Sequence, residues 1–490
     1  MSIKQKHVLF LCVVLIAFCN SCKQNQEEKS LLLYCAAGIK PVVEKVAKQY
    51  YEDYGVRVDL QYGGSGTLLS NLRVAKQGDL YLAADKSYIQ EAQSHGLIAE
   101  TQPLAFIKPV IAVAKGNPKD ITKIEDLYKE DVKVVIANPD AASIGRLTKK
   151  MLENAQLWEA FEPHVSVLMP TVNEVANTIK LGSTDAGIIW DATAQQYEDL
   201  EIVEVPLFNN YVKNVTIGVL NYSSQPTEAL KFIRYLSAKD KGLSVFKDYA
   251  YQIIEGDKWN EKPRLLFYSG GVNRVAIDKT IQDFEKREGV QVDRVYNGCG
   301  ILVSQIKAGQ RPDGYLSCDV SFMVQVEDKF GSIVDISKTD IVIAVKKGNP
   351  KNIKSLKDLT ADDLKLGVCN HNQSALGALT KKLLESQKLW ESVYKNVRSQ
   401  TPTADLLVNQ IRTGSLDAVV VYAANVAQVK DKIDIVHLTE DQANALQNFG
   451  ISNNSNYQNL MKRLLKALTA DSSKKNYLEN GFEWKYNTAN

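Results

Sequence analysis

The chain has 490 residues, of which 45% are hydrophobic and 24% charged, values typical of a globular protein with more than one domain. Its formal net charge of +2 gives no basis for a nucleic-acid partner or a broad acidic partner. Only four cysteines lie beyond residue 22, and they contain no CxxC pair, which excludes a disulfide-dense scaffold.

The first 22 residues have the form of an export signal. Lys4 and Lys6 precede an apolar run from Val8 to Phe18, which is too short to span a bilayer. The run ends at Cys19-Asn20-Ser21-Cys22, where a small residue precedes a cysteine. We predict a lipoprotein signal peptide over residues 1–22, lipidation of Cys22 and a polar tether over residues 23–30. An ordinary cleaved signal peptide is the alternative.

From residue 31 onward, strand-like and helix-like segments alternate. Short apolar runs predict strands over residues 31–34, 56–60, 80–83, 110–114, 134–137, 186–190, 202–205 and 215–220. Apolar residues at helical spacing predict helices between them, among others over residues 144–155, 174–181 and 230–236. This alternation indicates an α/β fold with mostly parallel sheets.

The turn Gly63-Gly64-Ser65-Gly66-Thr67 joins a predicted strand to a predicted helix. The N-terminus of a helix presents unbonded N–H groups and a partial positive charge, and glycines let a ligand approach that backbone closely. The turn therefore fits a seat for a small anion. Taken alone, it is better interpreted as a tight turn in which the glycines serve geometry only, because short Gly/Ser loops are common.

The order of motifs repeats about 233 residues later. Gly63–Gly66 matches Asn297–Gly300, and Ala84-Asp85 matches Cys318-Asp319. The same order pairs Leu32–Gly38 with Leu265–Gly271, Lys115–Pro118 with Lys347–Pro350, Leu147–Lys150 with Leu379–Lys382, and Asp185-Ala186 with Asp417-Ala418. We therefore predict two homologous units, unit A over residues 31–256 and unit B over residues 257–490.

Unit A resembles the molybdate/tungstate-binding components of bacterial ABC importers, which are class II periplasmic binding proteins. The resemblance rests on Tyr34–Gly38, Gly63–Gly66, Ala84–Ile89, Gly145 and Ala186–Trp190. It implies two α/β lobes per unit, joined by crossings near residues 108–110 and 207–216, with a ligand cleft between the lobes. It also implies an ABC permease as membrane partner, a place in the cell envelope facing the periplasm or the exterior, and neither enzymatic activity nor a cofactor.

The resemblance also implies how a tetrahedral dianion is held, namely by hydroxyls and by backbone N–H groups at helix starts. The corresponding positions are Gly38, Ser65, Ile144, Val172 and Trp190 in unit A, and Gly271, Cys299, Leu376, Ala404 and Tyr422 in unit B. Gly38 and Gly271 stand where the family has a serine, and Trp190 stands where it has a tyrosine. We expect unit B to be the weaker site, because a thiol is a poor donor.

The leading hypothesis is a lipid-anchored solute-binding protein that captures a molybdate- or tungstate-like oxyanion in unit A. The alternative is a tethered sensor or binding module for another small anion or an organic acid. A hydrolase is disfavoured, because His95 and His164 align away from Ser65. Cys299, Cys318, Cys369 and His371 lack metal-ligand spacing, so no metal is expected. One disulfide in the second half is compatible with an oxidising compartment, and its partners stay open.

Overall fold

The structure is a computed structural model that describes residues 30–429 and 431–487. It divides into two compact units after Glu255, and each unit is described by itself. The predicted signal peptide, Cys22 and residues 23–29 of the predicted tether lie outside the described residues. Within the described ranges, no helix has both the length and the apolarity needed to cross a membrane.

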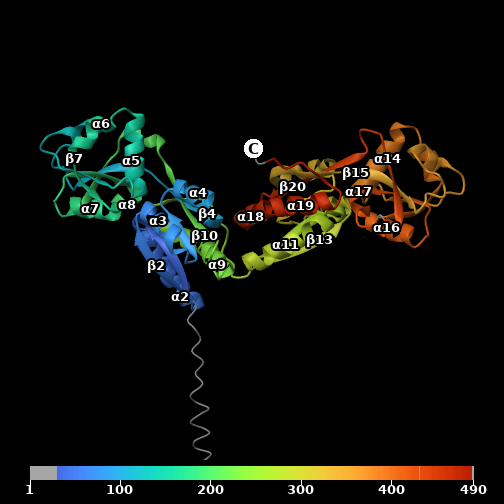
Figure 1. The fold of residues 1–490 in the computed structure, drawn as a ribbon, viewed down its shortest axis with the longest axis horizontal. Coiled ribbons are helices and arrows are strands. Elements are labelled where there is room, and N and C mark those ends of the chain that lie inside the picture. Colours follow the sequence, from blue (N-terminus) through green and yellow to red (C-terminus); the bar gives the residue numbers. More distant parts are fainter. Residues whose placement is uncertain (1–29, 430, 488–490) are drawn as a thin grey trace, which may run out of the picture. The chain divides into compact units, whose positions relative to one another are not determined.

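The first lobe of unit A is built on a six-stranded sheet in the order β11-β4-β10-β3-β1-β2 (Figure 1). The strands are β1 (Ser30–Ala36), β2 (Arg57–Gly63), β3 (Leu80–Ala83), β4 (Ile98–Ile107), β10 (Lys213–Leu220) and β11 (Gln252–Ile253). The helices are α2 (Lys40–Tyr54), α3 (Ser65–Ala75), α4 (Lys86–Ser94), α9 (Pro226–Leu236) and α10 (Gly242–Asp248), with the short η1 (Ala37–Ile39) after β1. Helix α2 ends at Gly55, whose left-handed φ of 66° suits glycine.

The second lobe of unit A contains a five-stranded sheet in the order β7-β6-β8-β5-β9. The strands are β5 (Pro109–Ala114), β6 (Val134–Ala137), β7 (Val165–Met169), β8 (Ala186–Trp190) and β9 (Leu200–Val203). The helical elements are α5 (Ser143–Asn154), α6 (Trp158–Phe161), α7 (Val172–Lys180), α8 (Asp191–Ala194), η2 (Ile124–Tyr128), η3 (Glu162–His164) and η4 (Pro206–Asn210). Strands β6 and β8 are wholly buried, which is why they read as unbroken apolar runs.

The chain passes between the two lobes of unit A twice. The first passage is Lys108, which separates β4 from β5, and the second is the segment between β9 and β10 that contains η4. Both lie where the resemblance placed them. The Asp191 carboxylate accepts hydrogen bonds from the backbone N–H groups of Lys108 (3.0 Å) and Ala192 (2.8 Å). It therefore fastens the first passage to the second lobe.

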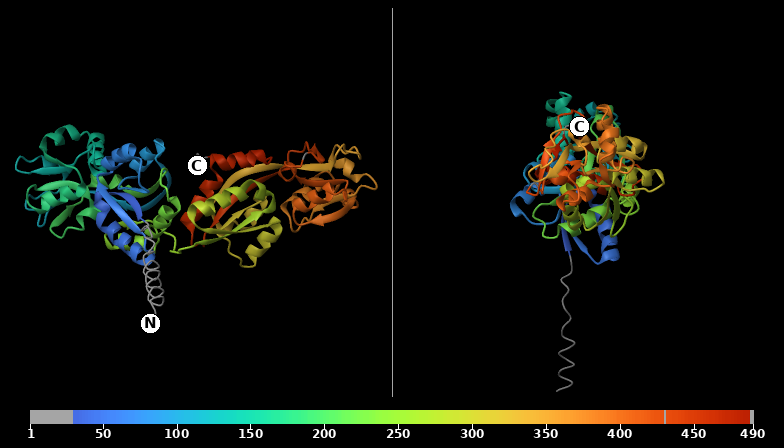
Figure 2. Two further views of the ribbon diagram at one scale, coloured as in Figure 1. Left: turned by 60° about the horizontal axis from the view of Figure 1, so that its bottom comes forward. Right: turned by 90° about the vertical axis from the view of Figure 1, so that its right-hand side faces the viewer.

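Unit B repeats this plan with one long strand. Strand β15 (Phe330–Lys346) runs for 17 residues through both lobes and takes the place of β4 and β5 (Figure 2). The sheet path is consequently continuous, in the order β13-β12-β14-β20-β15-β18-β16-β17, with β19 and β21 also paired to β15. The other strands are β12 (Arg264–Gly270), β13 (Gln291–Asn297), β14 (Gly314–Leu316), β16 (Leu366–Cys369), β17 (Val397–Thr401), β18 (Ala418–Tyr422), β19 (Ile433–His437), β20 (Asn444–Ser452) and β21 (Glu483–Trp484).

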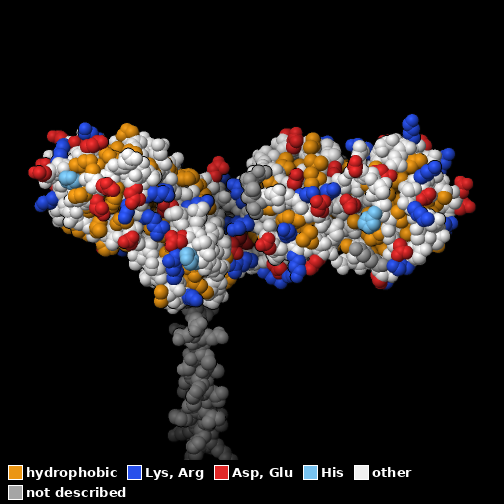
Figure 3. Space-filling model, turned by 45° about the horizontal axis from the view of Figure 1, so that its top comes forward, with side chains coloured by type: hydrophobic (Ala, Val, Ile, Leu, Met, Phe, Trp, Pro, Cys, Tyr) orange, Lys and Arg blue, Asp and Glu red, His pale blue; other side chains and the backbone are white. Residues whose placement is uncertain are grey.

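The helices of unit B cover the same two lobes. Those of the first lobe are α11 (Arg274–Glu288), α12 (Cys299–Lys307), α13 (Val320–Met323), α18 (Gln458–Leu468) and α19 (Asp471–Glu479), with η5 (Gly271–Asn273) and η6 (Val324–Lys329). Those of the second lobe are α14 (Ala375–Ser386), α15 (Trp390–Tyr394), α16 (Ala404–Arg412) and α17 (Ala423–Val426), with η7 (Leu356–Thr360). On the face shown in Figure 3, acidic and basic side chains are interspersed, in keeping with the small net charge.

The α/β prediction with two tandem two-lobed units is confirmed. The prediction of mostly parallel sheets is wrong, because strands on either side of the passages between the lobes are antiparallel to their neighbours. Strand β10 is antiparallel to β3 and β4, and β5 is antiparallel to β8 and β9. A chain that crosses to a second lobe and returns must reverse direction, so mixed sheets follow from the two-lobed plan.

Candidate functional site

A small cavity lies between the two lobes of unit A. The centre of a water molecule can occupy about 20 Å³ of it. This volume has room for about one small molecule or ion. The lining residues are Ala36, Ala37, Gly38, Gly63, Gly64, Ser65, Ala84, Ala142, Ser143, Ile144, Thr171, Val172 and Trp190. Not one of these lining residues carries a charge.

Ser65, the first residue of α3, presents its hydroxyl to this cavity from the first lobe. Its Oγ accepts a hydrogen bond from the Ala84 N–H (3.3 Å), and Tyr81 Oη donates to its carbonyl (2.7 Å). The side chain is 1% exposed. The hydroxyl hydrogen has no acceptor among the described residues, so it is available to donate into the cavity.

Two helices of the second lobe also begin at the cavity. The N-cap of α5, Ala142, has no side chain to bond the first turn, and within the described residues the N–H groups of Ser143 and Ile144 have no acceptor. At α7 the Thr171 side chain caps the Glu174 N–H, and the Val172 N–H has no acceptor among the described residues. Unbonded N–H groups and helix dipoles from both lobes therefore converge on one small space.

Ser143 was missed by the sequence comparison, which selected its neighbour Ile144 for a backbone N–H. Ser143 lines the cavity, is 4% exposed and makes no side-chain hydrogen bond to any described residue. It is a second hydroxyl donor beside Ser65. A serine at the first position of a helix is the sequence signal for it, because that position faces whatever the helix N-terminus faces.

Gly38 and Trp190 stand where the resemblance led us to expect a serine and a tyrosine. A Cβ on Gly38 would lie 2.8 Å from Val172 Cγ1, so a serine has no room unless Val172 moves. The Gly38 carbonyl accepts a hydrogen bond from Tyr251 Oη (2.9 Å). Trp190 ends β8, is 2% exposed and lines the cavity next to Gly38. The structure thus brings all five predicted unit A positions to one cavity.

The glycine turn has a second role, in holding the two lobes together. The N–H groups of Gly66 and Thr67 donate to the Ala141 carbonyl of the second lobe (2.9 and 3.2 Å). A Cβ on Gly64 would overlap that same carbonyl oxygen. Of the first N–H groups of α3, two are therefore taken by the opposite lobe, and the predicted anion seat on this helix is reduced to Ser65.

A charged clasp also joins the lobes of unit A. Arg146 on α5 pairs with Glu91 on α4 (3.1 Å), and its guanidinium lies over the Tyr88 ring, 3.8 Å from the centroid. Arg73 pairs with the same Glu91 (2.7 Å). By element alignment, unit B has Ala378, Gln325 and Phe322 at the positions of Arg146, Glu91 and Tyr88, so it lacks this clasp.

The strand registers correct one pairing between the two units. Ala36 pairs with Gly63 in unit A, and Gly270 pairs with Asn297 in unit B. Ala36 therefore matches Gly270, and the predicted match of Gly38 with Gly271 is wrong by one residue. Gly38 corresponds to Val272, which is 5% exposed. The sequence comparison was misled by the two successive glycines at residues 270 and 271.

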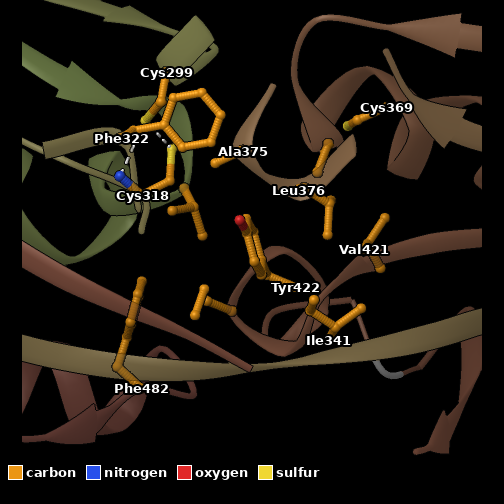
Figure 4. Packing of buried hydrophobic residues seen from close by; sticks show 14 of the residues in the cluster. Cys299, Cys318, Phe322, Ile341, Cys369, Ala375, Leu376, Val421, Tyr422 and Phe482 are labelled. Atoms are coloured by element: carbon orange, nitrogen blue, oxygen red, sulfur yellow. Dashed lines mark hydrogen bonds between the residues drawn. The ribbon is translucent and has the colours of Figure 1, made fainter. Parts of the chain in front are cut away.

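The cleft region of unit B is filled with apolar side chains. One buried hydrophobic cluster spans both lobes and contains Val272, Cys299, Ala375, Leu376, Ala404 and Tyr422. Figure 4 labels Cys299, Ala375, Leu376 and Tyr422 among them. Ala375 stands where unit A has Ser143, so this hydroxyl is lost as well. The Tyr422 hydroxyl is buried and has no hydrogen-bond partner among the described residues. The four other unit B predictions, Cys299, Leu376, Ala404 and Tyr422, thus lie together, in a setting poor in donors.

Comparison with known proteins identifies the chain's family. The model of a family described as bacterial extracellular solute-binding protein matches residues 31–252 and again residues 265–483. The chain belongs to this family. Its members are non-enzymatic components of transport systems, and the present chain is a tandem, ABC-importer-type solute-binding protein similar to the molybdate-binding proteins named ModA.

Three relatives illustrate the similarity. The ModA protein of Mycobacterium bovis is 26% identical over 219 residues, which are 44% of this chain and 81% of that protein. The ModA protein of Escherichia coli is 20% identical over 235 residues, or 46% of this chain and 90% of that protein. The solved periplasmic molybdate-binding protein of Azotobacter vinelandii is 14% identical with a TM-score of 0.40, covering 46% of this chain and all of that one (100%).

Removing the Arg146 side chain should loosen unit A. In Arg146→Ala, the amides of Gly66 and Thr67 should exchange hydrogen about threefold to tenfold faster, because the clasp contributes about 1 kcal/mol to closure as a half-exposed ion pair with a cation–π contact. Hydrogen exchange with mass spectrometry of the α3 peptide measures this. Lys150→Ala, an exposed change on the same helix, should have no effect. Unchanged exchange in Arg146→Ala would show that the clasp does not stabilise closure.

Proposed function

We propose that unit A binds a single tetrahedral oxyanion dianion of the molybdate, tungstate or sulfate type and presents it to an ABC permease. The observation that carries this proposal is the convergence of two hydroxyls, Ser65 and Ser143, and the starts of α3, α5 and α7 on one cavity without charged side chains. The starts of α5 and α7, whose first N–H groups are unbonded, each contribute a partial positive charge of about half an elementary charge. Together with neutral hydrogen-bond donors, these charges offset a buried dianion.

The size of the cavity supports a small inorganic ion. A cavity with room for about one small molecule or ion suits one central atom with four oxygens better than a larger carbon skeleton. The cross-lobe hydrogen bonds from Gly66 and Thr67 to Ala141 hold the cavity at this size. An organic acid or a sugar phosphate would require the lobes to stay apart. The closed form therefore favours the oxyanion over the organic-acid alternative.

The hydrogen-bond acceptors of the cavity also distinguish between oxyanions. At neutral pH the phosphate dianion carries a proton, whereas sulfate and molybdate carry none, so phosphate needs an acceptor in its site. No carboxylate lines the cavity, so a protonated anion would find only neutral acceptors there, which form weaker hydrogen bonds than a charged one. Asp191, which follows Trp190 in sequence, does not line the cavity, and its Oδ1 accepts the N–H groups of Lys108 and Ala192. We therefore expect phosphate to bind more weakly than the ions that carry no proton.

We further propose that the chain is anchored in the membrane by a lipid on Cys22. The basic start, the short apolar run and the small residue before Cys22 support this, and the polar residues 23–30 suit a tether that lets the protein face the periplasm or exterior. The family membership is in keeping with this location. Because unit B lacks the Ser65 and Ser143 hydroxyls, we assign the ligand to unit A alone.

Calorimetric titration of the whole mature chain with molybdate, tungstate, sulfate and phosphate tests the binding proposal. We expect one ion per chain, with phosphate at least tenfold weaker than the best of the other three. Ser65→Ala and Ser143→Ala should each weaken binding about tenfold to 150-fold, since a hydrogen bond to a charged group is worth about 1.5–3 kcal/mol.

The matched control for these variants is Ser374→Ala, which removes a serine from the start of the equivalent helix region in unit B and should leave affinity unchanged. Saturable heat with none of the four ions would exclude the oxyanion proposal. A loss of affinity in Ser374→Ala, with none in Ser143→Ala, would place the ligand in unit B instead.

Lipidation is tested on the protein isolated from its native membrane. The N-terminal peptide should begin at Cys22 and carry the mass of acyl chains, and Cys22→Ser should release the protein from the membrane fraction. The variant should be released because Cys22 provides the only thiol at the processed N-terminus to which a lipid could be attached. A mature chain that begins elsewhere and remains soluble would contradict the anchor while leaving the anion proposal intact.

A further inference from the structure

Unit B places two thiols where unit A has its anion-binding hydroxyl. Cys299 begins α12, as Ser65 begins α3, and Cys318 follows β14, as Ala84 follows β3. The two sulfur atoms lie 2.7 Å apart, and the Cys318 N–H donates to Cys299 Sγ (3.0 Å). Figure 4 shows the two side chains next to each other, with Cys369 apart from them.

The separation of the two sulfurs is informative. It is well inside the contact distance of two unbonded sulfur atoms and only about 0.7 Å longer than a disulfide bond of about 2.05 Å. Two thiols relieve such a contact either by moving apart or by bonding. Movement apart is restricted, because Cys299 and Cys318 are 0% and 5% exposed within the packed cluster of unit B.

The backbone beside the two sulfurs is adapted to them. A Cβ on Gly270 would overlap Cys318 Sγ and lie 3.0 Å from Cys299 Sγ. At the matching position unit A has Ala36, which fits there because its neighbours are the smaller Ser65 and Ala84. Three contacting positions thus differ together between the units, and the glycine makes room for the pair of sulfurs. This is the arrangement of a site built for both cysteines.

We propose that Cys299 and Cys318 form a disulfide in the mature protein. The family is extracellular or periplasmic, where disulfides form and persist. The oxidant is a protein disulfide of the thiol–disulfide oxidoreductase class. Its S–S bond breaks and takes up two electrons and two protons as two thiols, while the two S–H bonds of unit B break and one S–S bond forms.

The bond forms before the lobes of unit B close. Attack on the oxidant requires a thiolate. That thiolate must also meet the oxidant, and Cys299 and Cys318 are 0% and 5% exposed in the closed unit, so a protein oxidant cannot reach them there. Both cysteines belong to the first lobe, which can therefore be oxidised while the cleft is open or during folding.

The disulfide removes the S–H donors from the position that binds the anion in unit A. It turns an ancestral ligand seat into a covalent link between the start of α12 and the end of β14. The other two cysteines beyond residue 22 lie elsewhere. Cys35 lies in unit A, and Cys369 contacts Thr401 Oγ1 (3.9 Å). They serve as internal controls.

Thiol mapping of the whole mature protein, purified from an oxidising compartment without reductant, tests the proposal. The protein is denatured, alkylated and digested with trypsin, which cuts after Lys307 between the two cysteines. We expect one cross-linked peptide pair containing Cys299 and Cys318, with Cys35 and Cys369 alkylated. Full alkylation of Cys299 and Cys318, or a link from either to Cys369, would overturn the proposal.

Thermal unfolding provides an independent readout. A phosphine reductant present during unfolding should lower the melting temperature of unit B, and the Cys299→Ser/Cys318→Ser variant should melt low with or without reductant. Cys35→Ser and Cys369→Ser should keep the response to reductant. If the double variant does not fold, the response of the wild-type chain decides, and its absence would contradict a stabilising disulfide. Anion titration is not involved, so the outcome is separate from that for unit A.

Discussion

The contact on which unit A depends is the hydrogen bonding of the start of α3 to the Ala141 carbonyl across the cleft. The N–H groups of Gly66 and Thr67 donate to this carbonyl of the opposite lobe, while the preceding residue, Ser65, lines the cavity. One helix start therefore both closes the site and lines it. Gly64 is required because any side chain there would collide with the carbonyl. Closure and binding are coupled through the same four residues, as expected for a lobe movement that encloses a ligand.

The second unit retains the closing contact and changes the lining. Gly300 and Ile301 donate to the Gln373 carbonyl as their counterparts do to Ala141, and Gly298 again leaves room for that carbonyl. The interior, however, is apolar and contains two cysteines in place of Ser65 and Ala84. Duplication has thus preserved the fold and its closed form while the donors for a dianion were lost. The loss is coordinated, because Gly270 compensates for the bulk of the sulfurs.

Sequence reasoning found the repeat and the fold class, and the five positions that it proposed in unit A all line one cavity, because these depend on local patterns and on ordered motifs. It failed where tertiary packing decides. The antiparallel strands at the lobe passages follow from the return of the chain and have no local signal. Ser143 lines the cavity only because α5 begins there. A serine is excluded at residue 38 only because Val172 packs against that position. The mismatch of Gly271 arose because two successive glycines fit the alignment equally well, and only the pairing of Ala36 and Gly270 with the next strand resolves it.

The most direct test is a paired titration of Gly64→Ala and Gly298→Ala with the oxyanion that the wild-type chain binds best. Gly64 has φ −65° and ψ 145°, and Gly298 has φ −63° and ψ 136°, so alanine suits both backbones and collides only with the opposite lobe on closure. We predict that Gly64→Ala weakens binding at least tenfold, a cost of about 1.4 kcal/mol, with the fold intact. Gly298→Ala should bind as the wild type does. Equal affinity of wild type and Gly64→Ala would contradict an anion site closed by the two lobes of unit A.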